Sequence, residues 1–366
     1  MAQEAWLVTY GPGEDVWERF GHNALWLRDA EAGLDHTFSF GYFEMDRPGF
    51  HRDFARGIML YFGAVGTPER EFAFYRQRDR SISVQRLNLD AGQFRHLYQL
   101  LDEAIFPEPQ YYHYDYYFAN CSTWLRDLLD EVLEGELARQ WKTEPAAQNF
   151  RDHTRRLTEQ QFWLHTGMML LLGPLIDHQR NAWEEGFLPA SLAQWAATTQ
   201  IAGEPLVLDD QVLYAGSSHR PPATPQGTWL HSLAIGLGLA LLIAWPGLSG
   251  REFRHRLPWR LGLLASGIAG TLVLLMWLAS GHEATWRNGM VLLLNPLWLI
   301  FLAPGMMRVK RASMYLLLAG LVTGSVVLAW PAGQYRLDQV LLVAPMLGAL
   351  LLVTAKQCRQ PHAVSP

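Results

Sequence analysis

Cysteine is almost absent: the 366-residue sequence contains only Cys121 and Cys358. This number excludes the disulfide framework that stabilises small secreted domains. Clustered positive charge is also missing from the first 226 residues, where 19 lysines and arginines face 32 acidic residues. Nucleic-acid binding is therefore not expected, because contacts with phosphates need clustered basic side chains.

Charge of either sign is scarce in the rest of the chain. Residues 227–366 carry 11 basic and 3 acidic residues. Five apolar stretches there are each long enough to cross about 30 Å of hydrocarbon as a helix. They lie at residues 228–248, 261–279, 290–307, 314–330 and 337–355. A purely soluble protein is excluded, and the contrast between the two regions predicts two domains.

The basic residues between these stretches predict their orientation. Nine of them lie in the loops after the first and third stretches and in the tail, whereas the alternate loops hold only Arg287 and Arg336. The positive-inside rule places the first group in the cytoplasm, so five spans put the N-terminal region on the outer side. The opening residues, MAQEAW, lack the features of an export signal, and we expect that such a signal has been removed.

The expected organisation is an outer domain over residues 1–214, a linker at 215–227 and a five-span membrane domain with a cytoplasmic tail at 228–366. The linker is rich in proline, glycine and serine. Strand-like runs in the outer domain predict strands at 5–10, 23–29 and 36–43, and residue alternation predicts one at 81–89. Apolar spacing predicts helices at 91–105 and 121–133. The outer domain is therefore expected to be α+β, and the membrane domain all-α.

Cys121 is the first candidate for chemistry, because it stands at the predicted start of a helix. A helix N-terminus stabilises a thiolate and lowers the thiol pKa, and its backbone N–H groups can form an oxyanion hole. Asn120 is expected either to cap this helix or to donate its amide to the same oxyanion. The alternative is a buried structural cysteine, the commonest state of a free cysteine.

A thiol nucleophile needs a base, and the N-terminal region offers several histidines. His22 follows Gly21 at the entry to a predicted strand, whereas His113 lies in the aromatic run 111–118, close to Cys121 in sequence. Spacing alone leaves the two open, because catalytic pairs are adjacent in space rather than in sequence. The aromatic run itself suits either a groove at a membrane interface or a buried strand.

No metal or diffusible cofactor is expected, because the sequence has neither an HExxH motif nor a cysteine pair at metal spacing. Three polar residues, His282, Asn288 and Asn295, lie in or near the membrane stretches. Such residues are either functional or hydrogen-bonded between helices, and the sequence does not separate these alternatives.

Three segments carry a resemblance to a known family: YGPGEDVWERFGHNALWLRD, FSFGYFEMDRPGFHRDFARG and YDYYFANCSTWLRDLLD. They resemble the periplasmic domain of the Lnb-type lipoprotein N-acyltransferases, and TWRNGMVLLLNPLWLIF is similar to the membrane domain that accompanies it. The resemblance implies a permuted papain-like thiol-hydrolase fold with a dyad of Cys121 and His22. It further implies a third residue on the following strand, for which Ser39 is the candidate and His36 and Tyr42 are alternatives.

The resemblance implies a membrane-bound thiol acyltransferase that moves an acyl chain through a cysteine thioester. Its partner would be a lipoprotein or phospholipid, and its location the bacterial inner membrane with the catalytic domain in the periplasm. Two alternatives are a papain-like amidase or peptidase that acts on cell-wall peptide and a non-enzymatic membrane scaffold. Transferase and hydrolase activities, the acyl donor and acceptor, the substrate-binding residues and the oligomeric state stay open.

Overall fold

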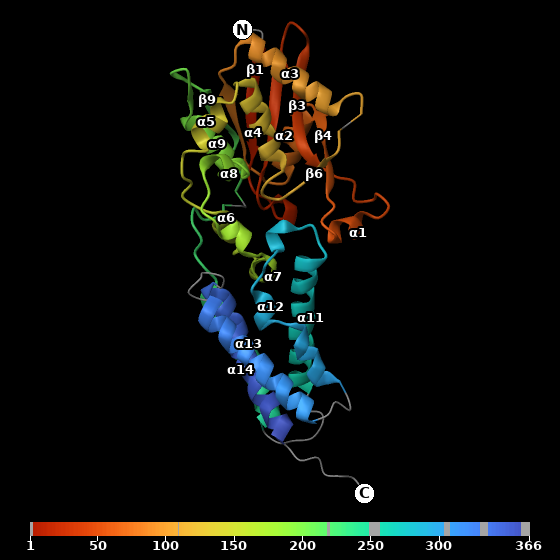
Figure 1. The fold of residues 1–366 in the computed structure, drawn as a ribbon. Coiled ribbons are helices and arrows are strands. Elements are labelled where there is room, and N and C mark those ends of the chain that lie inside the picture. Colours follow the sequence, from red (N-terminus) through yellow and green to blue (C-terminus); the bar gives the residue numbers. More distant parts are fainter. Residues whose placement is uncertain are drawn as a thin grey trace. The chain divides into compact units, whose positions relative to one another are not determined.

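The computed structural model describes residues 3–108, 110–217, 220–248, 257–303, 308–329 and 336–359. The chain forms two compact units, coloured along the sequence in Figure 1. The first comprises Met1–Gln160 and Asp177–Pro225, and the second comprises Gln161–Ile176 and Gln226–Pro366. The first unit is therefore interrupted by a segment that belongs to the second.

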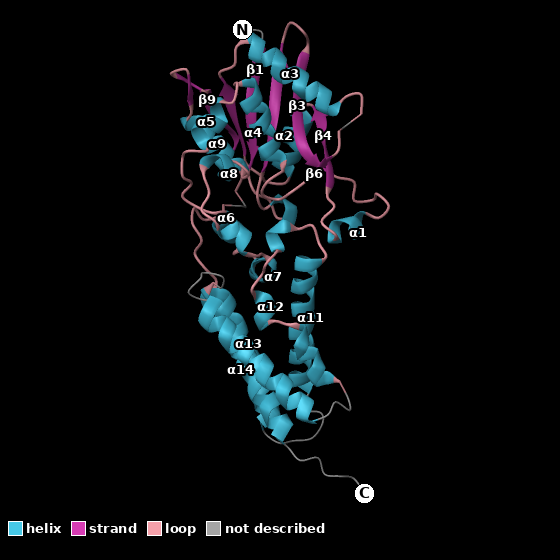
Figure 2. Cartoon of the chain, viewed as in Figure 1, coloured by secondary structure: helices cyan, strands magenta, loops and turns pink. Residues whose placement is uncertain are grey.

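A seven-stranded antiparallel sheet forms the centre of the first unit, with the strand order β6-β4-β3-β2-β1-β5-β9 (Figure 2). The strands are β1 Gln3–Tyr10, β2 His22–Asp29, β3 Leu34–Tyr42, β4 Leu60–Gly66, β5 Ile82–Leu87, β6 Tyr112–His113 and β9 Val207–Tyr214. A separate hairpin pairs β7 Gln200–Ile201 with β8 Glu204–Pro205. The four strands expected from the sequence are confirmed.

Helices cover both faces of this sheet. They are η1 Val16–Glu18, α1 Phe50–Ala55, α2 Pro68–Gln77, α3 Ala91–Ile105, α4 Cys121–Val132, α5 Glu136–Trp141, α6 Phe150–Thr158, α8 Ala182–Glu185 and α9 Pro189–Thr198. Both helices expected from apolar spacing, α3 and α4, are confirmed. The N-terminal domain is α+β, as expected.

The core divides according to the pleat of the strands, in which successive side chains point to opposite faces. Leu25 of β2 belongs to the cluster that packs the sheet against α3 and α4, together with Leu97 and Leu125. Its neighbour Ala24 belongs to the opposite cluster, which includes Phe72 of α2. Burial of each large side chain stabilises the fold by about 1.5–3 kcal/mol. This packing fixes the start of α4 relative to β2.

The second unit is helical. Its elements are α7 Phe162–Leu171, α10 Trp229–Leu248, α11 Leu257–Leu278, η4 Glu283–Thr285, α12 Met290–Leu293, η5 Pro296–Leu302, α13 Arg308–Ala329 and α14 Leu337–Arg359, with η2 Pro174–Asp177 at its boundary. Among the described residues, two helices are long and apolar enough to cross a membrane, Leu257–Leu278 and Leu337–Gln357. Shorter apolar helices lie at Trp229–Trp245 and Ser313–Gly324, and the apolar stretch Met290–Leu302 comprises α12 and η5.

The expectation of one continuous helix over residues 290–307 is wrong. The chain leaves α12 at Leu294, whose backbone is extended, and continues as the 3-10 helix η5 after Pro296. Proline disfavours the helical conformation of the preceding residue, here Asn295. Residues 304–307 and the loop arginines Arg251, Arg254 and Arg256 lie outside the described residues.

Two buried asparagines satisfy backbone groups where helices of the second unit are interrupted. Asn288 donates to the carbonyl of Leu170 at 2.8 Å and accepts from the N–H of Met290 at 2.9 Å. Asn295 accepts from the N–H of Leu297 at 3.0 Å. These contacts give both asparagines a structural role, and His282 is buried next to η4.

Candidate functional site

Cys121 is the first residue of α4, and Asn120 caps that helix. The side-chain oxygen of Asn120 accepts from the N–H groups of Ser122 and Thr123 at 2.9 and 3.0 Å. In return, the hydroxyl of Thr123 accepts from the N–H of Asn120 at 2.8 Å. This capping box fixes the backbone of the turn that carries the thiol.

Both amide hydrogens of Asn120 are engaged away from the thiol. Its Nδ2 donates to the carbonyl of Tyr116 at 3.0 Å and to that of Phe187 at 2.9 Å. An amide has two donor hydrogens, so none is left for an oxyanion. Of the two roles expected for Asn120, the structure places it in the capping role. The cap uses the backbone N–H groups of Ser122 and Thr123 and does not use that of Cys121.

The thiol of Cys121 is buried, with only 9% of the residue exposed. Burial raises the pKa of the thiol, whereas the nearby backbone N–H groups of Asn23 and Ser122 lower it by less. The helix start was expected to lower this pKa, and desolvation outweighs that effect. The thiol is therefore neutral at rest, so its nucleophilic use requires a base that removes its proton.

The start of β2 lies directly against the start of α4. The hydroxyl of Ser122 donates to the side-chain oxygen of Asn23 at 2.8 Å, and the backbone N–H of Asn23 approaches the sulfur of Cys121. His22 is the residue before Asn23 and the first of β2. The fold therefore brings His22–Asn23 beside Cys121–Ser122. Among the described contacts, no hydrogen bond joins the His22 ring to the thiol.

His22 lies beside a stack of planar groups. Its ring centroid is 6.0 Å from that of Tyr10, which is stacked on Tyr75 at 3.5 Å. The guanidinium of Arg80 lies over the Tyr75 ring at 4.6 Å. Burial, reinforced by the positive charge of Arg80, lowers the pKa of His22 to about 3. The imidazole is therefore neutral at physiological pH, the state that a general base requires.

Two glycines make room at this position. Gly21 has φ +85°, and a Cβ there would lie 2.8 Å from the carbonyl oxygen of Tyr10. Gly41 has φ +104°, and a Cβ there would lie 3.7 Å from the Cβ of Cys121. A side chain at either position would be strained by the positive φ, and at Gly21 its Cβ would also clash with the Tyr10 carbonyl oxygen.

Ser39 does not contact His22 in the described structure. It pairs with Ala24 in the sheet, and its hydroxyl donates to Glu71 Oε1 of α2 at 3.0 Å. Burial raises the pKa of the Glu71 carboxyl. The alternatives are no closer in register: His36 pairs with Leu27, and Tyr42 pairs with Phe62. No side chain within the described ranges accepts a hydrogen bond from the His22 ring.

His113, the sequence rival of His22, is exposed on β6 and pairs with Leu60. In the aromatic run 111–118, only Tyr112 and His113 form a strand, and the remainder is loop. Sequence reasoning missed Tyr10, Tyr75 and Arg80, which surround His22. No local motif marks them, because their relation to His22 arises from strand pairing and helix packing.

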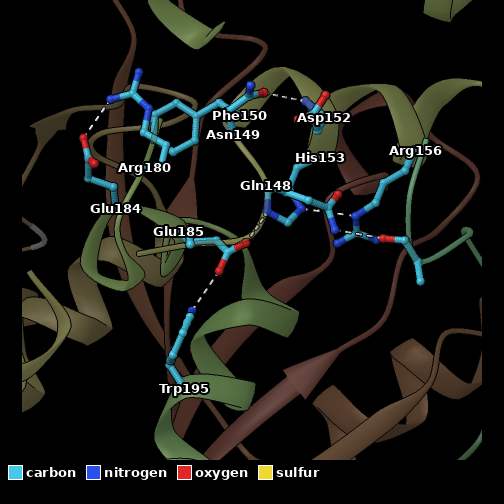
Figure 3. Close-up of polar contacts among 12 residues, drawn as sticks. Gln148, Asn149, Phe150, Asp152, His153, Arg156, Arg180, Glu184, Glu185 and Trp195 are labelled. Atoms are coloured by element: carbon cyan, nitrogen blue, oxygen red, sulfur yellow. Dashed lines mark hydrogen bonds and ion pairs between the residues drawn. The ribbon is translucent and has the colours of Figure 1, made fainter. Parts of the chain in front are cut away.

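Figure 3 shows a polar cluster around His153 and Glu185, both of which are buried. His153 Nε2 lies 2.7 Å from Glu185 Oε1, and Trp195 donates to Glu185 Oε2 at 2.9 Å. Arg156 donates to Nδ1 of His153 at 3.1 Å, which makes Nε2 the ring's donor to Glu185. These contacts join α6, α8 and α9. Glu185 stands two residues before Phe187, whose carbonyl accepts the hydrogen bond from the Asn120 amide.

Within the described residues, no group of three or more His, Cys, Asp or Glu side chains is placed to hold a metal ion. The structure presents instead a neutral buried thiol at the start of α4 and a neutral imidazole at the start of the neighbouring strand β2. The His22 ring itself packs with Tyr10 and Tyr75. A thiol and a neutral imidazole are the two groups that thiol-dependent nucleophilic catalysis uses.

Comparison with known proteins identifies the family. The Lnb N-terminal periplasmic domain matches residues 2–160, and the Lnb transmembrane domain matches residues 237–359. No curated protein and no solved structure matches. The two domain matches follow each other in the expected order and together cover about three quarters of the chain. The chain therefore belongs to the Lnb-type family and is a membrane protein with a periplasmic domain.

Proposed function

We propose that this protein is a cysteine-dependent acyltransferase whose nucleophile is Cys121 and whose base is His22. The observation that carries the proposal is the adjacency of His22–Asn23 and Cys121–Ser122, tied by the hydrogen bond between Ser122 and Asn23. The Lnb family matches support it from a separate direction. The permuted papain-like fold, in which a thiol at a helix start meets a histidine on a strand, agrees with this geometry.

In the first step, the sulfur of Cys121 attacks the carbonyl carbon of an acyl ester while His22 accepts the thiol proton. The ester C–O bond breaks, and the departing alkoxide takes this proton from the imidazolium. The products are a thioester on Cys121 and a free alcohol. In this step we propose that the backbone N–H of Cys121, which the Asn120 cap leaves unused, stabilises the oxyanion.

In the second step, an amine attacks the thioester carbonyl, and the C–S bond breaks. His22 accepts a proton from the attacking nitrogen, and the thiolate regains one from the imidazolium. The product is an amide. We propose the N-terminus of a lipoprotein as the acceptor and a lipoprotein or phospholipid ester as the donor. The setting we propose is the bacterial inner membrane, crossed by five spans.

Acyl trapping tests the proposal. Intact-mass analysis of the full chain with a diacylated lipopeptide should show one acyl adduct. The adduct should be absent from Cys121→Ala and present in Cys358→Ala, the matched control. It should form far more slowly in His22→Ala.

A lack of adduct in the wild-type chain under turnover would contradict the proposal. Release of peptides from muropeptides, without reaction on lipid esters, would support an amidase instead. A cellular phenotype that survives both Cys121→Ser and His22→Ala would support a scaffold without catalysis.

A further inference from the structure

Exposed apolar side chains gather at one end of the first unit. In the antiparallel sheet, the connecting segments 11–21, 43–59 and 106–120 all lie at the end at which β2 and α4 begin. We call the large apolar residues exposed at this end the aromatic rim. They are Val16, Trp17, Tyr42, Met45, Phe54, Phe106, Tyr111, Tyr116 and Phe118.

The opposite end of the sheet is different. Its connections are residues 30–33, 67, 88–90 and 133–135, and none of them exposes a large apolar side chain. They consist mainly of small and charged residues. Phe74, Tyr98, Leu208 and Val212 are also exposed, but they are scattered over α2, α3 and β9. Scattered exposed apolar residues need no explanation, whereas a group gathered at one end of a domain marks an interaction surface.

Ring contacts connect the aromatic rim with the surroundings of the thiol. Tyr111 of the rim lies 5.4 Å from Phe62, and Tyr116 lies 5.9 Å from Tyr114. Tyr114 is within 3.9 Å of the position that a Cβ on Gly41 would occupy, next to Cys121. Tyr116 of the rim is therefore connected through Tyr114 with the immediate surroundings of Cys121.

The composition of the rim indicates its partner. All of its members except Val16 and Met45 are aromatic. Tyrosine and tryptophan favour the headgroup region of a bilayer, where an apolar ring and a polar tip are both accommodated. Loop 43–59 has equal numbers of acidic residues and arginines, and its Asp53 is paired with Arg47 at 3.1 Å. Attraction to an anionic surface is therefore not the main contribution.

We propose that the aromatic rim inserts into the headgroup region of a lipid bilayer and so holds the end of the first unit at which α4 and Cys121 begin against the lipid surface. The chain is already a membrane protein, so a bilayer is always within reach of this unit. Insertion does not depend on any reaction of Cys121. The partner is a neutral lipid surface, reached by burial of aromatic area.

Depth-dependent quenching in proteoliposomes of phosphatidylcholine tests this inference on the full chain. A bimane label is placed at Met45→Cys or, in a second protein, at Phe54→Cys, with Cys121→Ala and Cys358→Ala in both. Ala32→Cys, in the turn at the opposite end, is the control. Lipids that carry a shallow nitroxide should quench both rim labels several-fold more than the control label, in low and in high salt.

Equal quenching of rim and control labels would overturn the inference. So would rim labels that only aqueous iodide quenches, or rim labels that neither quencher reaches because protein covers them. If high salt abolished the stronger quenching of the rim labels, the attraction to the bilayer would be mainly electrostatic. That result would also contradict the proposal. The labelled protein lacks Cys121, so these outcomes are independent of the acyl-trapping result.

Discussion

Two arginines that share one carboxylate differ in what else they touch. Arg78 and Arg80 both pair with Glu18, at 2.9 and 3.3 Å. The side chain of Arg78 is 38% exposed, whereas that of Arg80 is 4% exposed and lies over Tyr75, beside His22. A buried positive charge acts through a low dielectric, so Arg80 influences the imidazole much more strongly than Arg78.

We predict that Arg80→Met raises the pKa of His22. Removal of a nearby positive charge favours the imidazolium, so the neutral base is lost at a higher pH than in the wild type. Iodoacetamide alkylates Cys121 at a rate that should fall as the pH is lowered and the base becomes protonated. In Arg80→Met this acidic limb of the pH profile should therefore lie about one pH unit higher. The rate is followed by intact mass as a function of pH in a Cys358→Ala chain.

Arg78→Met is the control for this change, because it removes a charge from the same ion-pair group at the surface. Its acidic limb should coincide with that of the parent chain. An unchanged limb in Arg80→Met, or the same displacement in both variants, would contradict a specific influence of Arg80 on the base.

At the scale of elements, the start of α4 depends on the segment around α8. Asn120 reaches the carbonyl of Phe187 at 2.9 Å, and the pair His153–Glu185 fixes the helix just before Phe187. Glu185 uses one oxygen for His153 and the other for Trp195. An uncharged amide of the same shape cannot accept with both of its polar atoms.

We therefore predict that Glu185→Gln lowers the free energy of unfolding of the first unit by about 1–3 kcal/mol, since a buried donor loses its acceptor. Denaturant titration of the full chain, monitored by hydrogen exchange in α4, measures the change. Glu184→Gln is the neighbouring control. The Glu184 side chain, which pairs with Arg180, is 30% exposed. We therefore expect Glu184→Gln to lower the free energy of unfolding by less than about 1 kcal/mol.

If Glu185→Gln left the protection of α4 from hydrogen exchange unchanged, the polar cluster would not stabilise the cap. Equal losses in Glu184→Gln and Glu185→Gln would indicate a general effect of charge in α8. Either result would remove the structural basis for treating α6, α8 and α9 as supports of the Cys121 turn.

The strands and helices near the site could be predicted from sequence because their residue patterns are local. β1, β2, β3 and β5 are short runs rich in apolar and aromatic residues, and α4 places Leu125, Leu128 and Leu129 on one buried face. The partners of His22 could not be predicted, because Tyr10 reaches it through strand register and Tyr75 through the packing of α2. Apolar length suggested one helix over 290–307, where Pro296 outweighs hydropathy.

At the scale of the whole molecule, α7 packs with the helices that follow residue 226 rather than with its sequence neighbours. A buried polar group holds it there. His165 Nε2 lies 3.5 Å from Asp338 Oδ2, which also accepts from Thr228 at 3.3 Å. Gln339 donates to the carbonyl of Met169. These residues line a cavity of about 10 Å³, roughly the size that holds one water molecule.

We predict that Asp338→Asn loosens α7. The substitution removes the carboxylate that faces His165 and Thr228 in a buried setting, which costs about 1–3 kcal/mol. Peptides that contain residues 162–171 should exchange hydrogen faster in detergent-solubilised protein, and the thermal midpoint should fall. Glu283→Gln is the control, because Glu283 is an exposed acidic residue of the same unit.

If hydrogen exchange in α7 were unchanged in both Asp338→Asn and Glu283→Gln, the polar contacts would not hold α7 in place. Apolar packing would then be its main support. Faster exchange throughout α10, α11 and α14 in Asp338→Asn would instead indicate loss of the whole helical unit. The control variant should show neither effect.

The placement of α7 has a consequence for biosynthesis. The chain departs from its first unit at Gln161 and rejoins it at Asp177, while Gln339, which pins Met169, is translated 170 positions later. The ribosome therefore delivers α7 long before its polar contacts exist. Until α14 is synthesised, this apolar helix lacks its partners in α14, so the order of synthesis and the order of assembly differ.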